Sequence, residues 1–384
     1  MIKMFTARTS EIDEIEDAVA EIKSQIDFSV LRKNSGGLIL CHMDFVESGV
    51  VAALCEALPF GVIGMTSMAS ADEHGYGLFD LTLTVFTSDE VSFEVGMTDS
   101  ICRDNYQEEI SGVFGQMRSR VQDNPAMIVT FVPYVRDVAG YEVLDEMDKV
   151  CNGVPVWGSF TNSIDFTHET VQTICNGKNL RYGLAMMFIT GPVDPKFIVM
   201  SLPERNISTN RAIVTKSEGA IVRELNGMSV PEYLGNVGLV VTKETIVSTP
   251  MMIYYEGADE PVALGFFTLF EDGSVLAGGM IPEGTSCAVG NIDAQGIFDT
   301  AEAGLQKILE HENRQVTLMM PCVSRYVTLA PDRESELRLI EEKLTASGKP
   351  FMMGYSGGEI CPMPDSDGGL HNRFHNYTFC ACVL

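Results

Sequence analysis

The sequence predicts an α/β protein of mixed sheets backed by helices, with repeated strand-helix-strand-helix-strand units in two domains. Two observations carry this prediction. Apolar runs of strand length alternate with amphipathic helical stripes, and this order occurs three times along the chain. Other apolar runs follow one another with no helical stretch between them. Helix-linked strands combined with such hairpin-like runs indicate mixed sheets whose faces are covered by helices.

The first unit begins with a short strand over residues 2–7, followed by a helix with apolar residues at spacings of three and four. This stripe consists of Ile12, Ile15, Val19, Ile22 and Ile26. A strand over 37–41, a helix over 50–58 and a strand over 60–65 complete the unit. The last strand ends in a polar turn over 65–70, and a similar ending recurs in the other two units.

The other two units repeat this order. The second unit has its expected strands and helices at residues 91–95, 98–121, 127–131, 141–150 and 154–157. The third unit has them at residues 286–289, 293–308, 316–320, 332–344 and 351–354. Polar turns follow the last strands, at 158–163 and 355–359. Such turns satisfy their own backbone groups or bind an anion through hydroxyl and N–H groups.

Strands without intervening helices are expected between the units, at residues 78–87, 170–175, 182–190, 196–200, 212–215 and 262–270. The domain boundary is expected at Pro203-Glu204-Arg205-Asn206, where proline and polar residues separate two apolar stretches. This boundary divides the chain into residues 1–205 and 206–384. In the second part, Asn226-Gly227 is a strong hairpin signal.

The composition excludes several classes of function. The net charge of −27 and the sequence pI of about 4.5 make the surface repel nucleic acid and anionic membranes. No apolar run reaches the length of about 18 residues that a spanning helix needs, so no membrane insertion is expected. The ten cysteines lack repeated Cys-x-x-Cys spacing, and the start at Met1 lacks a secretory leader. We therefore expect a cytoplasmic protein with free thiols and no metal site.

The last 35 residues contain the strongest candidate site. A strand over 351–354 leads into a glycine-rich turn ending in Glu359, and His375 and Asn376 precede a final apolar strand. The strands at 316–320 and 351–354 are joined by one helix, so their carboxyl ends are expected at one edge of a sheet, where open α/β sheets bind ligands. The expected ligand-binding residues are Cys322, Arg325, Tyr355, Gly358, Glu359, His375 and Asn376.

This end of the sequence resembles a FIST-domain protein. The resemblance rests on Gly354-Tyr355, Gly358-Glu359-Ile360, His375-Asn376-x-Thr378 and the Cys-x-x-Arg segment over 322–325. It is looser over residues 30–200, and residues 65–75 lack the Gly-Glu-Ile ending that the family usually has there. The resemblance implies a FIST N-like domain over 1–205, a FIST C-like domain over 206–384, and a sensory module for small ligands such as amino acids.

The expected function is therefore that of a stand-alone small-ligand sensor. Its expected ligand is an amino acid or a similar small polar molecule, and it signals through an unidentified partner protein. Arg325 is expected to pair with a ligand carboxylate and Glu359 with a ligand ammonium group, while His375 and Asn376 hold the polar remainder. The competing interpretation is structural, with Glu359 and His375 joining the terminal strand to the turn.

Two further functions stay open. An enzyme would use a Cys322 thiolate, or the pair of Glu359 and His375. The sequence lacks a convincing nucleophile–base–orienter set, so we do not expect catalysis.

A haem-binding gas sensor would use His42, His74 or His168, because some FIST-family members are associated with haem. The sequence has no Cys-x-x-Cys-His motif, so no cofactor is expected.

Overall fold

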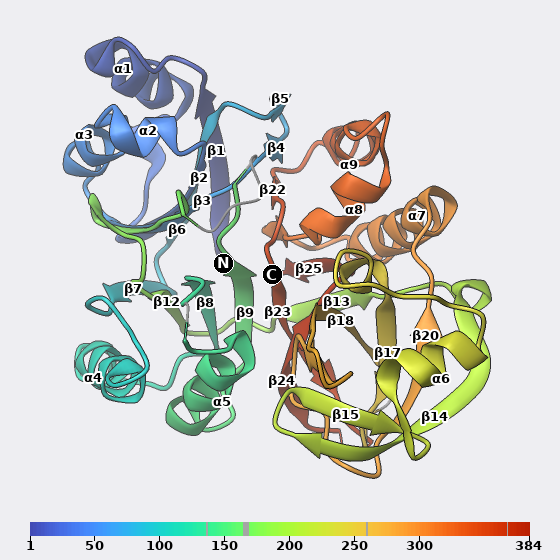
Figure 1. The fold of residues 1–384 in the computed structure, drawn as a ribbon. Helices are drawn as coiled ribbons and strands as arrows, with labels where there is room; N and C mark the ends of the chain where they lie inside the picture. Colours follow the sequence, from blue (N-terminus) through green and yellow to red (C-terminus); the bar gives the residue numbers. More distant parts are fainter. Residues whose placement is uncertain (136, 164–168, 259, 367) are drawn as a thin grey trace.

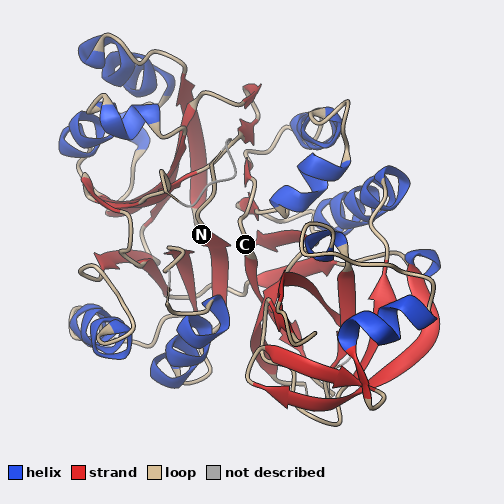
Figure 2. Ribbon diagram, in the orientation of Figure 1, coloured by secondary structure: helices blue, strands red, loops and turns tan. Residues whose placement is uncertain are grey.

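The computed structural model describes residues 1–135, 137–163, 169–258, 260–366 and 368–384. These residues form four β-sheets with helices on their outer faces, which confirms the predicted α/β class (Figure 2). Figure 1 shows three sheets around the middle of the molecule, where both termini lie, and a fourth sheet beside them.

The first sheet contains the strands β1 (Lys3–Thr9), β2 (Asn34–Cys41), β3 (Gly61–Thr66), β6 (Leu81–Ser88), β10 (Thr173–Cys175) and β11 (Lys178–Leu180). Their order is β1-β6-β2-β3-β10-β11. Its helices are α1 (Ile15–Gln25), α2 (Asp44–Glu47), α3 (Val50–Ala57) and the 3-10 helix η1 (Phe28–Val30). β2 and β3 run parallel, and β6 returns antiparallel between β1 and β2.

The second sheet contains β7 (Ser92–Met97), β8 (Met127–Val132), β9 (Val156–Phe160), β12 (Ala185–Thr190), β23 (Glu359–Pro364) and β24 (Leu370–His375). Their order is β24-β23-β9-β8-β12-β7. Its helices are α4 (Tyr106–Arg118) and α5 (Gly140–Cys151). β8 runs parallel to β9 and antiparallel to β12, which is the arrangement of β2, β3 and β6 in the first sheet.

The third sheet contains β4 (Ser70–Asp72), β5 (Gly75–Gly77), β13 (Lys196–Met200), β21 (Thr317–Met319), β22 (Met352–Gly354) and β25 (Phe379–Val383). Their order is β13-β25-β21-β22-β4-β5. Its helices are α7 (Ala294–Glu310), α8 (Val323–Thr328) and α9 (Ser335–Thr345). β21 runs parallel to β22 and antiparallel to β25, so β8 and β21 occupy equivalent positions in their sheets.

Each of these sheets is completed by a hairpin from another part of the chain. β4 of the β4–β5 hairpin pairs with β22, β10 of the β10–β11 hairpin pairs with β3, and β23 of the β23–β24 hairpin pairs with β9. The first unit therefore completes the third sheet, the second unit the first, and the third unit the second. This ring of exchanges makes the three sheets depend on one another.

The fourth sheet, called the barrel below, contains β14 (Ile207–Glu218), β15 (Ile221–Leu225), β16 (Met228–Ser229), β17 (Pro250–Tyr254), β18 (Val262–Leu269), β19 (Val275–Ala277) and β20 (Ser286–Gly290). An additional pairing of β14 with β15 closes it. The helix α6 (Val230–Asn236) and the 3-10 helices η2 (Glu204–Asn206) and η3 (Ile246–Ser248) accompany it. Asn226 and Gly227 both have positive φ, 54° and 76°, and form the predicted hairpin turn between β15 and β16.

The barrel corrects one prediction about the third unit. Residues 286–289 form β20 inside the barrel, and the first strand of the third sheet is β13 instead. The barrel is inserted between β13 and α7, and its two connections run side by side. There the Asn206 side chain donates to the Asn291 carbonyl at 2.9 Å, and Asn291 N donates to the Asn206 carbonyl at 2.8 Å. Hydrophobic periodicity detected both apolar strands, but it does not specify the sheet to which a strand belongs.

A buried core joins the three sheets at their centre. It draws Leu40 from the first sheet, Val129 and Trp157 from the second, and Leu318 and Cys380 from the third. Trp157, the single tryptophan of the sequence, is fully buried there. In the part of the chain that the structure describes, no helix is long and apolar enough to cross a membrane.

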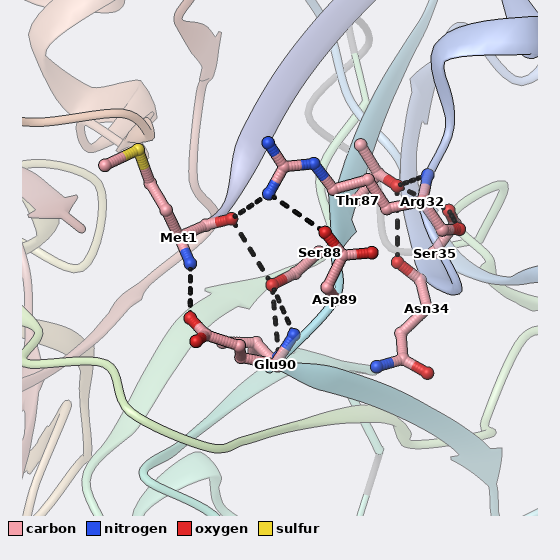
Figure 3. Close-up of polar contacts among 9 residues, drawn as sticks. Met1, Arg32, Asn34, Ser35, Thr87, Ser88, Asp89 and Glu90 are labelled. Atoms are coloured by element: carbon pink, nitrogen blue, oxygen red, sulfur yellow. Dashed lines mark hydrogen bonds and ion pairs between the residues drawn. The ribbon is translucent and has the colours of Figure 1, made fainter.

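The N-terminus is held at the turn between the first and second sheets (Figure 3). The Met1 amino group donates to Glu90 Oε2 at 2.9 Å, and Arg32 Nη1 donates to the Met1 carbonyl at 3.1 Å. Ser88 Oγ accepts from the backbone N–H of Glu90, which shapes the turn from β6 to β7. The chain start is thereby tied to the point where the first unit passes into the second.

Candidate functional site

The three predicted polar turns meet at one place, which we call the junction. Asn162, after β9, accepts from Met68 N at 3.0 Å and donates through its amide to the Tyr355 carbonyl. Ser67, after β3, also donates to the Tyr355 carbonyl, at 3.4 Å. All of these side chains are buried. One asparagine thus links turns from all three sheets, a convergence that the sequence patterns did not reveal.

Glu359 and His375 lie beside this junction as direct cross-strand partners on β23 and β24. Both are fully buried. Glu359 Oε2 accepts from Thr378 Oγ1 at 2.7 Å and from Thr378 N at 3.3 Å, and His375 Nε2 lies 3.1 Å from the Cys361 carbonyl oxygen. Within the described residues, Glu359 Oε1 and His375 Nδ1 have no hydrogen-bond partner. Each side chain therefore fixes local backbone with one atom and leaves another unsatisfied.

The protonation states of this pair follow from burial. Burial raises the pKa of Glu359 to about 8, although the hydrogen bonds from Thr378 oppose the shift. Burial lowers the pKa of His375 to about 4. At neutral pH both groups are mainly uncharged, because a low-dielectric interior disfavours the charged forms. The pair is thus a neutral acid beside a neutral imidazole.

Cys322 lies next to Glu359 at the start of α8. Its thiol contacts Ser324 Oγ at 3.5 Å. Burial, and then the nearby Glu359 carboxylate, raise the pKa of the Cys322 thiol far above its usual range. Nucleophilic cysteines have the opposite shift, since the thiolate is the reactive form. This environment therefore does not favour covalent catalysis at Cys322.

Arg325 lies buried on α8, three residues after Cys322, and its side chain connects α8 to α7 and α9. Its Nε and Nη2 donate to Glu336 Oε1 of α9 at 2.9 and 2.6 Å, and Nη2 also donates to the Ile297 carbonyl of α7 at 2.9 Å. Its Nη1 donates to Thr300 Oγ1 at 3.0 Å and to the Tyr377 carbonyl at 3.4 Å. An arginine has five N–H donors, and all five are used here.

The remaining predicted residues also have structural partners. Tyr355 donates through its hydroxyl to Glu336 Oε2 at 3.3 Å, which places it with Arg325. Asn376 Oδ1 accepts from Gly265 N of β18 at 2.9 Å and so joins the terminal segment to the barrel. A Cβ at Gly358 would lie 2.5 Å from the Phe374 ring, so this position requires glycine. The predicted residues therefore fall into two buried clusters. Glu359 and His375 pair across β23 and β24, whereas Arg325 and Tyr355 share Glu336.

An open cavity of about 580 Å³ lies between the barrel and the third sheet. Its polar lining comprises Ser201, Glu204, Ser208, Thr209, Arg211, Tyr254, Glu260 and Lys307. Its apolar lining comprises Val199, Met200, Leu202, Ile207, Met252, Pro261 and Met363. None of the seven predicted site residues is among these described lining residues. The prediction that they line a ligand cleft stays a prediction.

Arg211 is the best-oriented charged group of this cavity. Its guanidinium carbon lies 3.3 Å from the centre of the Tyr254 ring, so the planar group is stacked on the phenol. Across the described residues, no hydrogen bond or ion pair joins Arg211, Lys307, Glu204 or Glu260 to another side chain. Among the described residues, the cavity therefore carries two cations and two carboxylates without an ion-paired side chain.

A neighbouring cavity of about 550 Å³ provides a contrast. It contains Arg373, which lies 4.8 Å from the centre of the Tyr255 ring. That arginine forms an ion pair with Asp365 at 3.7 Å, whereas Arg211 has no such partner. Arg211 is thus the more available of the two stacked arginines.

Sequence reasoning missed Arg211 and Tyr254, although a local signal was present. Ala212 and Val214 of β14 face the barrel core, so their neighbour Arg211 faces outward. The same alternation along β17 places Ile253 inside and Tyr254 outside. A strand pattern could therefore predict that each side chain is exposed. The sheet order β14-β20-β17, which the sequence pattern does not specify, brings both residues to the same cavity.

The structure describes two of the three histidines considered for haem. His42 Nδ1 lies 3.3 Å from Asp44 Oδ2, and His74 Nε2 lies 4.0 Å from Glu73 Oε1. His168 lies outside the described residues. Over the described ranges, no group of three or more His, Cys, Asp or Glu side chains is arranged to hold a metal ion.

Comparison with known proteins gives matches to two family models and a weak likeness to solved structures. The FIST N domain model matches residues 37–228, and the FIST C domain model matches residues 231–362. No curated protein matches. A solved structure described as "Cyanuric acid hydrolase: evolutionary innovation by structural concatenation" has 10% sequence identity and a TM-score of 0.29, covering 76% of this chain and 100% of that chain. Because the two family models together cover most of the sequence, this chain belongs to the FIST family.

Proposed function

We propose that this protein is a small-ligand sensor that binds an amino acid or a similar small zwitterion and acts through a partner protein. FIST domains are sensory domains of signal-transduction proteins, which supports the general role. All ten cysteines are free, which agrees with a reducing cytoplasm as the place of action.

The observation that carries the proposal is Arg211 at the cavity, which has no ion-pair partner among the described residues. A guanidinium held flat against a ring presents its N–H groups in the fork that a carboxylate requires. Glu260, on the lining of the same cavity, is a suitable acceptor for an ammonium group. A cavity of about 580 Å³ has the size of ordinary small-molecule sites. Both ends of a zwitterion therefore find an opposite charge.

The position of the cavity supports a sensory role. Arg211 and Tyr254 come from the barrel, whereas Met200 and Lys307 come from β13 and α7 of the third sheet. A ligand that contacts both parts stabilises the arrangement in which they are close together. A partner that recognises this arrangement would then receive the signal.

Isothermal titration calorimetry with a panel of amino acids tests the proposal. Arg211→Ala should weaken binding about 10- to 100-fold, because a hydrogen bond to a charged group contributes roughly 1.5–3 kcal/mol. Arg223→Ala is the matched control. Arg223 lies on the same barrel but pairs with Glu218 and Asp272 at 3.3 and 3.2 Å, so its removal should leave affinity unchanged.

Two ligand analogues separate the charges. The amide of the best-binding amino acid lacks the carboxylate, and its N-acetyl derivative lacks the ammonium group. Both should bind more weakly than the parent compound, and only the N-acetyl derivative should remain sensitive to Arg211→Ala. Equal affinities of wild type and Arg211→Ala would contradict the cavity as the site. A loss of binding in Glu359→Gln alone would place the ligand at the junction instead.

A further inference from the structure

We propose that the Arg211 cavity and the neighbouring cavity that contains Arg373 together bind a short peptide. This inference rests on the proposed function, because it names the class of zwitterion that Arg211 holds. The carboxylate of the peptide lies at Arg211, and its ammonium group lies in the neighbouring cavity of about 550 Å³. There, Glu256 and Glu283 provide the negative charge.

The two cavities follow each other along the outer face of the neighbouring strands β14, β20 and β17. Ser286 of β20 lies opposite Ile213 of β14 and opposite Tyr254 of β17. A residue next to each of them in sequence belongs to the barrel core, so these three side chains face outward. Arg211 belongs to the next outward row, opposite Ala288. The first cavity is lined by Arg211 and Tyr254, and the second by Tyr254 and Ser286, so the cavities meet at Tyr254.

The residues at this meeting point are accessible to a ligand. Arg211 is exposed, and Tyr254, Thr285 and Ser286 are partly exposed. Ser286 is the small residue between Ile213 and Tyr254, so it forms a low floor between two larger side chains. Among the described residues, no hydrogen bond uses the hydroxyl groups of Thr285 and Ser286. These hydroxyls can therefore bind the peptide groups of a ligand, which a free amino acid lacks.

The second cavity has the charge that an ammonium group requires. Its arginine, Arg373, is compensated by an ion pair with Asp365 at 3.7 Å. Glu256 and Glu283 are exposed, and in the described part of the chain neither forms an ion pair. Glu283 Oε1 accepts from Ser217 N at 3.2 Å, which orients this carboxylate. The charges of the second cavity that lack a partner are therefore negative.

The spacing of the charges fits a peptide better than a free amino acid. Gly284 N, next to Glu283, donates to the Val214 carbonyl at 2.8 Å. Glu283 is therefore close to the level of Val214, which follows Arg211 by three positions on β14. Three positions of a strand correspond to about 10 Å. An extended chain spans at most about 3.3–3.6 Å per residue, so about three residues are needed to reach from one charge to the other.

Calorimetry on the full chain with glycine, diglycine and triglycine tests the inference. All three are zwitterions without side chains, so they differ only in the distance between the charges and in the number of peptide groups. Triglycine should bind about tenfold or more tightly than glycine, and N-acetyltriglycine, which lacks the ammonium group, should lose this gain. Equal affinities of glycine and triglycine would overturn the inference while leaving the proposed function in place. Absence of binding for these compounds and for every amino acid would overturn both.

The double variant Glu256→Gln with Glu283→Gln locates the ammonium end. It should weaken triglycine binding about fivefold or more and leave the affinity for N-acetyltriglycine unchanged. Glu271→Gln is the matched control, because Glu271 is an exposed carboxylate of the same barrel and is not among the lining residues of either cavity. Thermal unfolding checks that both variants are folded. Unchanged triglycine affinity in the double variant would overturn the inference, and if Arg211→Ala still weakens binding, the proposed function stands without it.

Discussion

Glu359 and His375 show how burial alone can hold two ionisable residues in their neutral forms. Burial raises the pKa of Glu359 from 4.5 to about 8, so the folded state holds its proton more tightly than the unfolded state does. Its contribution to stability is full below about pH 4.5 and is lost as the pH rises toward 8. Burial lowers the pKa of His375 from 6.5 to about 4, so its effect has the opposite sign between these values. Up to about pH 6.5, the two groups therefore change the unfolding free energy in opposite directions as the pH rises.

This difference predicts a pH-dependent loss of stability above pH 6.5. Between pH 6.5 and 8 only Glu359 titrates in this pair, so wild type should lose about 2 kcal/mol of unfolding free energy through it. The glutamine in Glu359→Gln does not titrate. The unfolding free energy of this variant should therefore fall by about 2 kcal/mol less than that of wild type over the same interval. Urea unfolding of both proteins at pH 6.5 and 8 measures the difference. Parallel pH profiles would contradict the assigned pKa.

Arg325 illustrates what residue patterns leave open. The sequence marked it as a ligand-binding group, because an arginine after a strand end suits a carboxylate. In the structure Glu336 is that carboxylate, 2.6 Å away on α9. A signal was available, since Glu336, Ile340 and Leu344 recur every four residues and lie on the buried face of the helix. A carboxylate on a buried face requires a cationic partner, although the sequence does not identify which one.

At the scale of elements, the pair of Arg325 and Glu336 holds α7, α8 and α9 together. Removing one partner leaves an uncompensated buried charge, so Arg325→Ala should destabilise the protein by about 3–5 kcal/mol. The double variant Arg325→Met with Glu336→Leu removes both charges and should recover part of the loss, because the Ile297 and Tyr377 carbonyls and the Tyr355 hydroxyl lose their partners. Urea unfolding of the three proteins gives the comparison. A double variant as unstable as the single one would contradict this interpretation.

The elements themselves were the most predictable part of the fold. The helix expected over 293–308 forms as α7, with Ile297 to Ile308 on its buried face, and Asp293 caps it by accepting from Gly296 N at 2.7 Å. Local spacing and local hydrogen bonds determine such features. The partner sheet of β20 depends on contacts distant in sequence, so the pattern could not assign it. The same limit applies to the cavity, whose lining comes from separate segments.

At the scale of the whole molecule, the exchanged hairpins predict that the chain unfolds as one unit. The proposed division at residues 205 and 206 separates β9 from β23 and the β4–β5 hairpin from β22. A fragment of residues 1–205 would expose unpaired strand edges, which favour aggregation. We expect this fragment to be unfolded or aggregated when it is produced alone.

Trp157 offers a direct measurement of this cooperativity. It is fully buried in the core shared by the three sheets, so its fluorescence reports on their packing. Urea transitions followed by Trp157 fluorescence and by far-ultraviolet circular dichroism should coincide. Two separate transitions, or a fragment of residues 1–205 that folds alone, would support two independent domains instead.

The inserted barrel has a consequence for how such a chain can change over time. Its entry and exit lie side by side at Asn206 and Asn291, so the segment between them can be lengthened, shortened or exchanged without moving β13 or α7. The barrel supplies Arg211, Tyr254 and Met252 to the cavity, whereas Met363 belongs to the exchanged hairpins. The lining of the cavity can therefore change by replacement of one self-contained segment while the scaffold of the other three sheets keeps its shape.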